Sequence, residues 1–265
     1  YPNGSADVNH FHAAGGTGTL FKALLDAGLM HPEATTCFGD NFGDFCQEPI
    51  LVDDRIEWRP AASQSLDTDI LTTPKTPFST NGGVKLLEGN LGRCVIKTSA
   101  VDASHHVVEA PAVVIDDQDD LRPLFEAGEL DRDCVVVVRF QGPAANGMPE
   151  LHKLTPMLGV IQDRGFKVAL VTDGRMSGAS GKVPAAIHLV PEASQGGLLA
   201  QLKTGDVIRR DATTGVLSAL VDATDLERRV VSVAPAPRGT VGRILFNNSR
   251  QAVSSAEEGA SSLFN

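Results

Sequence analysis

The stretch from Cys134 to Lys182 constrains the fold most, because apolar runs alternate there with polar, glycine-rich loops. Residues 134–139 (CVVVVR) and 168–172 (VALVT) are apolar runs typical of buried strands. Between them, apolar residues recur at helical spacing: Leu151, Leu154, Met157, Leu158 and Ile161. The order strand, loop, helix, strand predicts a right-handed βαβ unit with parallel strands, and therefore an α/β fold class.

Each of these two strands is followed by a loop suited to binding a ligand. Parallel strands place their carboxyl ends at one edge of a sheet, where α/β proteins bind ligands. Glycines let the backbone approach a ligand, and hydroxyls and amides can bind its oxygens. Glu150 and Ser177 are therefore predicted to meet across one crevice. On the pattern alone, an ordinary glycine-rich connection stays an open alternative.

Two common motifs do not fit the loop at 173–182. A nucleophile elbow needs glycine two residues before its serine, but Arg175 stands there ahead of Ser177. A P-loop needs Ser or Thr after Gly-Lys, but Val183 follows Lys182. The residues alone thus indicate a functional loop and leave its chemistry unnamed.

The remaining sequence divides into two parts joined by a connector. A helix is predicted at 17–27, ended by Gly28. Residues 60–80 are rich in Pro, Ser, Thr and Asp without periodicity, which suits a connector between domains. From residue 81 to 265, short Val- and Ile-rich runs alternate with turns, which favours a barrel-like α/β domain with flanking helices.

Three further segments give local predictions. Asp53, Asp54 and Arg55 indicate a turn. The acidic run at 116–120 is interpreted as a helix cap, since EF-hand spacing for calcium is absent. The Ser- and Ala-rich tail at 249–265 is predicted to be a loosely packed helix.

Composition argues against two classes of partner. A net charge of −10 disfavours a nucleic-acid surface, although local Lys and Arg can still bind an anionic substrate. No apolar run reaches membrane length, so no membrane partner is expected. The four cysteines form no CxxC pair, and their spread suggests a reducing cytoplasm. The chain starts inside a motif and without Met, so we interpret it as the carboxyl-terminal part of a longer protein.

The two loops resemble those of a known enzyme family. QGPAANGMPE (141–150) and TDGRMSGAS (172–180) are similar to the paired loops of the dihydroxy-acid dehydratase/6-phosphogluconate dehydratase family. Further matches cover nearly the whole chain: NHFHAAGG (9–16), LLDAGLM (24–30), NGGVKLLEGNLGR (81–93), VIKTSAV (95–101), VPEA (190–193) and GDVI (205–208). Gln141 and GMPELHKL (147–154) resemble its sugar-acid phosphate branch; the amino-acid-pathway branch tends to have Glu at the former and an Arg-Glu-Met run within the latter.

The resemblance implies an architecture and cofactors. Residues 1–59 would end an α/β amino-terminal domain that carries the cluster and metal, and residues 81–265 would form a β-barrel swivelling domain. The family uses Mg²⁺ and an iron–sulfur cluster, expected to be 4Fe-4S with its ligands outside this chain. A homodimer in the cytoplasm is also implied.

The resemblance also implies roles for individual residues. Glu150 matches a Mg²⁺ ligand, and Ser177 matches the serine whose alkoxide is the base. Ser180 and the amide of Gly178 are expected to hold the substrate carboxylate. The phosphate candidates are Arg175, His152, Lys153 and Lys182, of which His152 and Lys153 are preferred.

The residues themselves leave simpler interpretations open. Glu150 suits the first turn of a helix, where the dipole favours a carboxylate. The Ser177 hydroxyl can bond its own backbone, and His152 and Lys153 can face solvent on a helix.

The expected reaction is dehydration of 6-phospho-D-gluconate to 2-dehydro-3-deoxy-6-phospho-D-gluconate, a step of the Entner–Doudoroff pathway. Isolated from the missing portion, the fragment is expected to be inactive. One alternative is a dehydratase of an unphosphorylated sugar acid or a branched dihydroxy acid. The other is a non-catalytic domain that binds a sugar acid.

Overall fold

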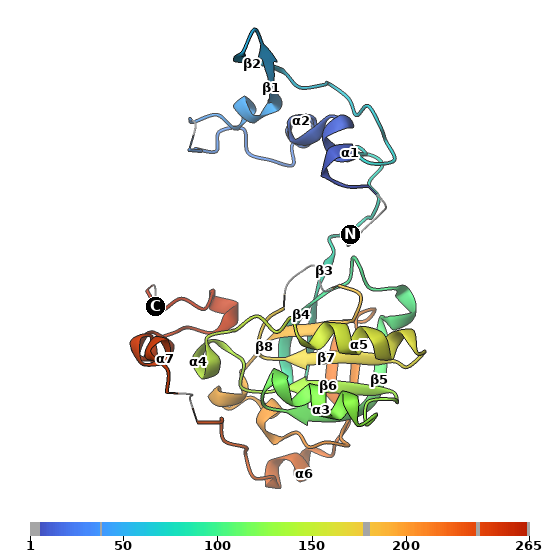
Figure 1. Cartoon of the computed structure of the whole chain (residues 1–265), viewed down its shortest axis with the longest axis vertical. Helices are drawn as coiled ribbons and strands as arrows, with labels where there is room; N and C mark the ends of the chain where they lie inside the picture. Colours follow the sequence, from blue (N-terminus) through green and yellow to red (C-terminus); the bar gives the residue numbers. More distant parts are fainter. Residues whose placement is uncertain (1–5, 38, 177–180, 237–238, 264–265) are drawn as a thin grey trace. The chain divides into compact units, whose positions relative to one another are not determined.

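A computed structural model describes residues 6–37, 39–176, 181–236 and 239–263 of the chain (Figure 1). The chain divides into two compact units, and the division falls between Asn81 and Gly82. Within the described residues, the helices are too short or too polar to cross a membrane.

The first unit combines short helices with one β-hairpin. Its elements are α1 (Val8–Ala13), α2 (Gly16–Asp26), the 3₁₀ helix η1 (Phe42–Cys46), β1 (Gln47–Val52) and β2 (Arg55–Pro60). The helix predicted at 17–27 is confirmed by α2, and Gly28 follows it with a φ of 69°. The predicted turn is also confirmed: Asp53 and Asp54 have positive φ and join β1 to its antiparallel partner β2.

The second unit is built on a closed barrel of eight strands. The strands are β3 (Val84–Gly89), β4 (Gly92–Lys97), β5 (Val107–Ile115), β6 (Cys134–Val138), β7 (Val168–Thr172), β8 (Ala185–Val190), β9 (Val207–Asp211) and β10 (Val216–Ala219). Their order around the barrel is β10-β3-β4-β8-β7-β6-β5-β9. The predicted βαβ pair is confirmed, because β6 and β7 lie parallel and in register along their whole length.

Strands β6 and β7 are buried on both faces, which explains their uninterrupted apolar sequences. Val135 and Val137 belong to the core inside the barrel, together with Ala169 and Val171 of β7. The alternate residues of both strands belong to a second core beneath α3 and α5: Cys134, Val136, Val138, Val168 and Leu170. The alternation follows from the two-residue period of a strand. The predicted barrel-like α/β architecture is therefore confirmed.

Short helices connect the strands and cover one side of the barrel, where α3 and α5 lie across β6 and β7 (Figure 1). They are η2 (Ala103–His105), η3 (Gln118–Asp120), α3 (Leu121–Glu126), α4 (Pro143–Asn146), α5 (Leu154–Asp163), η5 (Ala193–Gln195), η6 (Leu198–Gln201), α6 (Ala223–Arg228), α7 (Val241–Leu245), α8 (Asn247–Gln251) and η7 (Ala256–Glu258). The acidic run caps a helix as predicted, since a carboxylate oxygen of Asp117 accepts the N–H of Asp119 at 3.0 Å.

The prediction of a helix over residues 249–265 is wrong. Helix α8 ends at Gln251, and only one 3₁₀ turn, η7, follows it within the described residues. Ser255 caps this turn together with Glu258, and the N–H of Ser254 donates to the carbonyl of Ser261 at 2.9 Å. Serine side chains that bond nearby backbone groups compete with a continuous helix, which explains the difference.

Candidate active site

A buried carboxylate, Asp173, joins the loops that follow three neighbouring parallel strands. It comes directly after β7 and is fully buried. One oxygen accepts the N–H of Gln141, after β6, at 2.8 Å. The other accepts the N–H groups of Phe140 at 3.2 Å and Ala193, after β8, at 2.9 Å. One side chain thus satisfies three backbone donors and holds the carboxyl edge of the barrel together.

The ionisation of Asp173 reflects this environment. The pKa of Asp173 is raised to about 6: burial is the main cause and the charge of Glu192 adds to it, whereas the three N–H bonds offset part of the rise. The carboxylate form therefore predominates at pH 7. Sequence analysis did not assign a role to Asp173; the signal for one was an acidic residue directly after a wholly apolar strand.

A second buried carboxylate, Glu192, fixes the start of α4. Its two oxygens accept the N–H groups of Ala144 at 3.0 Å and Ala145 at 3.2 Å. These donors belong to the first turn of α4, which has no other side-chain cap. Gly142 is tightly enclosed beside this contact, because a Cβ atom there would lie 2.2 Å from a carboxylate oxygen of Glu192.

Gly142→Ala is therefore expected to displace Glu192 from α4 and to lower the free energy of unfolding by about 1–2 kcal/mol, the usual effect of losing a helix cap. Urea unfolding followed by far-UV circular dichroism measures this change. Gly159→Ala is a suitable control, because a Cβ atom there meets nothing within 4 Å. A Gly142→Ala protein as stable as the wild type would contradict the packing described here.

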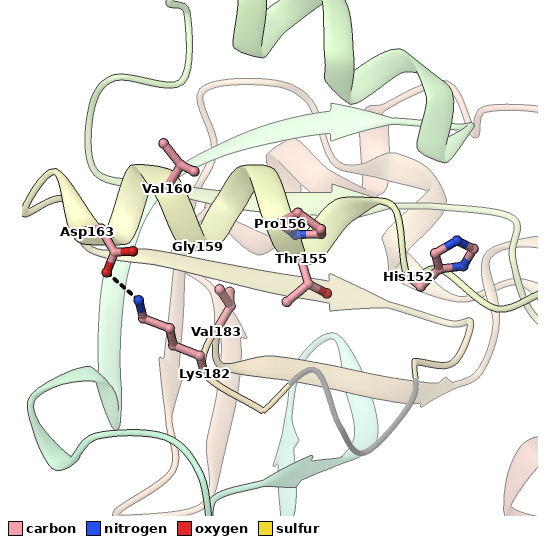
Figure 2. Close-up of a pocket in the computed structure, with 8 residues that line it drawn as sticks. All are labelled: His152, Thr155, Pro156, Gly159, Val160, Asp163, Lys182 and Val183. Atoms are coloured by element: carbon pink, nitrogen blue, oxygen red, sulfur yellow. Dashed lines mark hydrogen bonds and ion pairs between the residues drawn. The ribbon is translucent and has the colours of Figure 1, made fainter. Parts of the chain in front are cut away.

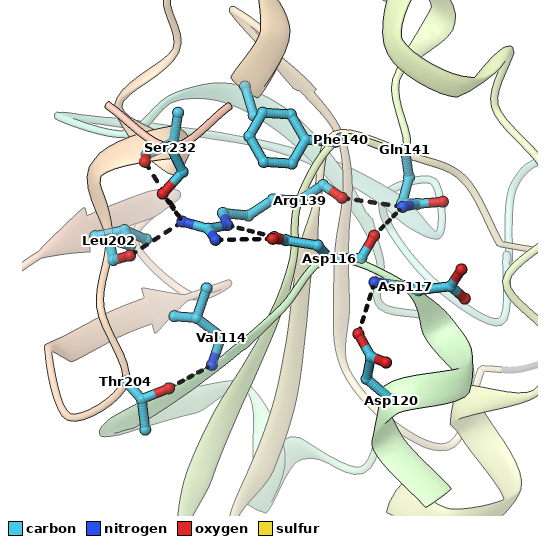
Figure 3. A network of polar contacts seen from close by, with 12 residues as sticks. Val114, Asp116, Asp117, Asp120, Arg139, Phe140, Gln141, Leu202, Thr204 and Ser232 are labelled. Carbon is cyan, nitrogen blue, oxygen red and sulfur yellow. Dashed lines mark hydrogen bonds and ion pairs between the residues drawn. The ribbon is translucent and has the colours of Figure 1, made fainter. Parts of the chain in front are cut away.

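An ion-pair network around Arg139 braces the same edge of the barrel (Figure 3). The guanidinium donates to both oxygens of Asp116, from Nε at 2.7 Å and from Nη2 at 3.1 Å. It also donates from Nη1 to the hydroxyl of Ser232 at 2.9 Å. Arg139 is only 9% exposed, and a buried arginine needs such a partner. The network attaches the segment after α6 to the barrel.

Gln141 is held by both ends of its amide group. Its Nε2 donates to the carbonyls of Asp116 at 2.7 Å and Arg139 at 3.0 Å, as Figure 3 shows. Its oxygen accepts from the amide nitrogen of Asn146 at 2.8 Å. A glutamate would place a second oxygen against the two carbonyls and repel them. This loop conformation therefore favours glutamine over glutamate at position 141.

Glu150 and Arg175 bring the two predicted loops together. A guanidinium nitrogen of Arg175 lies 3.2 Å from a carboxylate oxygen of Glu150, and its Nε donates to the carbonyl of Met148 at 2.9 Å. The N–H of Leu151 donates back to the carbonyl of Arg175 at 3.3 Å. The loops after β6 and β7 thus meet, as their topology predicts. Ser177, Gly178 and Ser180 lie outside the described residues, two to five positions beyond Arg175.

His188, in β8, lies next to these loops. Its N–H donates to the carbonyl of Gly174 at 2.9 Å, and its φ is 58°. Burial lowers the pKa of His188, and the charge of Arg175 lowers it further. The imidazole is therefore neutral at pH 7.

The predicted phosphate-binding residues are not gathered in one place. His152 and Lys182 line a surface pocket of about 380 Å³ along α5 (Figure 2). They lie toward opposite ends of that helix, and Lys182 pairs with Asp163. Lys153 pairs with Asp119 at 2.7 Å and lines a different hollow. Arg175 contacts Glu150, as described above.

Comparisons of the sequence with known proteins identify the family of this chain. Residues 69–260 match the model of the dihydroxy-acid/6-phosphogluconate dehydratase C-terminal region. The chain belongs to the dihydroxy-acid/6-phosphogluconate dehydratase family. Among curated members of this family, the chain is 58% identical to a phosphogluconate dehydratase of Pseudomonas aeruginosa over 99% of its length and 55% identical to that of Escherichia coli K12 over 98%. It is 33% identical to a dihydroxy-acid dehydratase of Wolinella succinogenes over 96%. The chain spans 43% of the length of each of these three relatives.

The donor atoms of this family member fit a shared metal site better than a complete one. Glu150 offers a carboxylate oxygen, the ligand that Mg²⁺ prefers, at the meeting point of the two loops. Within 6–37, 39–176, 181–236 and 239–263, no three His, Cys, Asp or Glu side chains gather as a metal centre. The carboxylate of Glu150 thus has the chemistry of a Mg²⁺ ligand.

The cysteines of the chain do not fit an iron–sulfur cluster. Cys94 and Cys134 are buried on separate strands, in separate cores. Burial raises the pKa of Cys94 to about 12 and that of Cys134 to about 11, which disfavours the thiolate that a cluster needs. Cys37 and Cys46 belong to the other unit.

Proposed function

We propose that the chain is the carboxyl-terminal part of an enzyme that dehydrates 6-phospho-D-gluconate to 2-dehydro-3-deoxy-6-phospho-D-gluconate, the Entner–Doudoroff step. One observation carries this proposal: relatives named phosphogluconate dehydratase from three organisms are 50–58% identical to the chain over 99–100% of its length, against 33% for the dihydroxy-acid dehydratase. The loop conformation that favours glutamine over glutamate at position 141 supports the same substrate assignment.

The proposed chemistry divides between this chain and cofactors. Ser177 takes the C2 proton, and the hydroxyl at C3 leaves with a proton as water; the resulting enol then becomes the 2-keto acid. When bound, Mg²⁺ and an iron–sulfur cluster supply charge neutralisation at the carboxylate and a Lewis acid at the C3 hydroxyl. Glu150 provides one oxygen for Mg²⁺, and Asp173 and Glu192 hold the loops that present these groups.

Substrate binding in this proposal uses the loop beyond Arg175. Ser180 and the amide of Gly178 hold the substrate carboxylate. The ion pair of Arg175 with Glu150 links the start of this loop to the loop that carries Glu150. The phosphate is bound by cationic side chains near these loops. The candidates from the sequence included His152, Lys153 and Lys182.

The proposed setting follows the family resemblance. Residues 1–59 end the amino-terminal domain that carries cluster and metal, residues 60–80 connect, and residues 81–265 form a swivelling barrel domain. A cytoplasmic homodimer is proposed, and the absence of disulfides among the four cysteines supports a reducing compartment.

A substrate panel tests the proposal. The full-length protein, purified without oxygen and supplied with Mg²⁺, is assayed for 2-keto acid from 6-phosphogluconate, gluconate and 2,3-dihydroxyisovalerate. Turnover of 6-phosphogluconate alone is expected. Preferred turnover of either other acid would discard the substrate assignment, and binding without turnover by a cluster-loaded protein would favour a non-catalytic domain.

A further inference from the structure

A hollow of about 250 Å³ lies beside the loop that carries Glu150. One wall comes from the segments after β5 and β6, and the other from the C-terminal segment around α7 and α8. Pro149, the residue before Glu150, lines it, as does Gln141. The hollow therefore adjoins the proposed reaction centre without coinciding with it.

Two arginines from the C-terminal segment line this hollow. Arg243 donates from Nη1 to the carbonyl of Asn146 at 3.2 Å. Arg250 donates from Nη1 to the carbonyl of Ala145 at 3.2 Å and from Nη2 to the side-chain oxygen of Asn247 at 3.2 Å. A guanidinium has five N–H donors, so these neutral acceptors use only part of each group.

One of the remaining donors is buried without an acceptor. The Nε of Arg250 has no hydrogen-bond partner among the described residues, although it is inaccessible to solvent. A buried donor of a charged group left unmatched is costly and indicates that an acceptor is missing. Arg250 lines the hollow, and an anion there would be met by its Nη groups, whose donors the carbonyl of Ala145 and the side chain of Asn247 use only in part.

The acidic side chains of the hollow are largely neutralised. Asp116 is paired with Arg139, and Asp119 with Lys153 at 2.7 Å. Asp117 caps η3 through its carboxylate. The hollow therefore combines carboxylate acceptors suited to hydroxyl groups on one wall with two arginines suited to a phosphate on the other. A polyhydroxylated chain ending in a phosphate matches both features.

The other pocket is a weaker fit for a phosphate. It contains His152 and Lys182, which lie toward opposite ends of α5. In contrast, Lys153, Arg243 and Arg250 line one hollow.

We propose that this hollow is the phosphate subsite, with Arg243 and Arg250 as its principal ligands and Lys153 as a third cation. The assignment rests on the proposed function. It agrees with the substrate, whose phosphate at C6 lies four carbons from the C2 proton that Ser177 removes, so that the phosphate must bind beside the catalytic loops.

The test uses Arg243→Gln and Arg250→Gln in the full-length enzyme, with inorganic phosphate as a competitive inhibitor. For each variant we expect KM for 6-phosphogluconate and Ki for phosphate to rise together by about 10-fold or more, as expected for losing a charge-assisted contact. The value of kcat should stay within about 3-fold of the wild type. Arg122→Gln, an exposed arginine paired only with Glu126 among the described residues, should change neither constant.

Competing outcomes are distinguishable. If the arginines only support the carbonyls of α4, kcat falls while Ki for phosphate stays constant, and the subsite is overturned. Arg243→Lys and Arg250→Lys keep the charge and should recover part of the lost affinity. A wild-type enzyme that is inactive on 6-phosphogluconate refutes the proposed function instead. The subsite is then tested by calorimetric titration with inorganic phosphate. Loss of phosphate binding in both Gln variants supports the subsite, and unchanged binding rejects it.

Discussion

Asp173→Ala is expected to lower the free energy of unfolding of the barrel unit by about 3 kcal/mol or more, because three buried N–H donors lose their only acceptor and each orphaned donor costs about 1–3 kcal/mol. The donors belong to Phe140, Gln141 and Ala193, so the loops after β6 and β8 lose their common anchor. Activity should fall with stability, since these loops lead into α4 and the loop that carries Glu150.

The pH dependence of the free energy of unfolding separates the effect of the Asp173 charge from the effect of its shape. Its pKa is about 6 in the folded chain against the usual 3.8 of an aspartate, so the folded state binds the proton more tightly than the unfolded chain. Stability from this group is therefore fully present below pH 4 and is lost as the pH rises through 6. From pH 4 to 7.5, wild type should lose up to about 3 kcal/mol relative to Asp173→Asn, which does not titrate.

Far-UV circular dichroism in urea, with hydrogen exchange of barrel amides, measures both effects. Tryptophan fluorescence is unsuitable, because the only tryptophan, Trp58, lies in β2 of the other unit. Asp163→Asn is a matched control, since its carboxylate is 64% exposed and a surface ion pair contributes little. A stability difference between wild type and Asp173→Asn that is constant from pH 4 to 7.5 would contradict the raised pKa.

Ser177→Ala in the full-length enzyme is expected to reduce kcat for 6-phosphogluconate by about 10²–10⁴-fold, the usual contribution of a general base. The C2 proton is weakly acidic, so the proposed reaction depends on a base at this position. KM should change much less, because Ser177 is assigned to proton removal and the loop residues Ser180 and Gly178 to binding.

The measurement combines initial rates with exchange of the C2 proton for deuterium from solvent, which should be lost in the variant. Ser194→Ala, at an exposed position after β8, is the control and should keep normal turnover. A Ser177→Ala enzyme with near-normal kcat and normal exchange would reject Ser177 as the base.

Local pattern was sufficient for part of the fold. The apolar runs at 134–138 and 168–172, with a helix of regular spacing between them, predicted the parallel pair β6–β7. The acidic run at 116–120 was predicted to cap a helix, and Asp117 does so, because capping depends on the two or three following residues. The tail prediction failed for a related reason: composition favoured a helix, but serine side chains satisfied the backbone locally.

The candidate site was predictable only in outline. Topology placed the loops after β6 and β7 at one edge, and the contact of Glu150 with Arg175 bears this out. The roles of Glu150 and Ser177 came from family resemblance, since motif spacing named no chemistry. Neither source identified Asp173, Glu192 or Arg139, whose hydrogen-bond partners described above lie between 20 and 93 residues away along the chain.

By itself, then, the sequence determined the α/β class, the central parallel strands, the capped helices and the two loops, because periodicity and capping act over a few residues. Tertiary structure alone decided the closure of the barrel, the placement of β8 beside β7, and the convergence of the C-terminal arginines on the loop before Glu150. These features depend on contacts between segments distant in sequence, whose free energy comes from shared burial and from matching buried charges, and no local pattern encodes them.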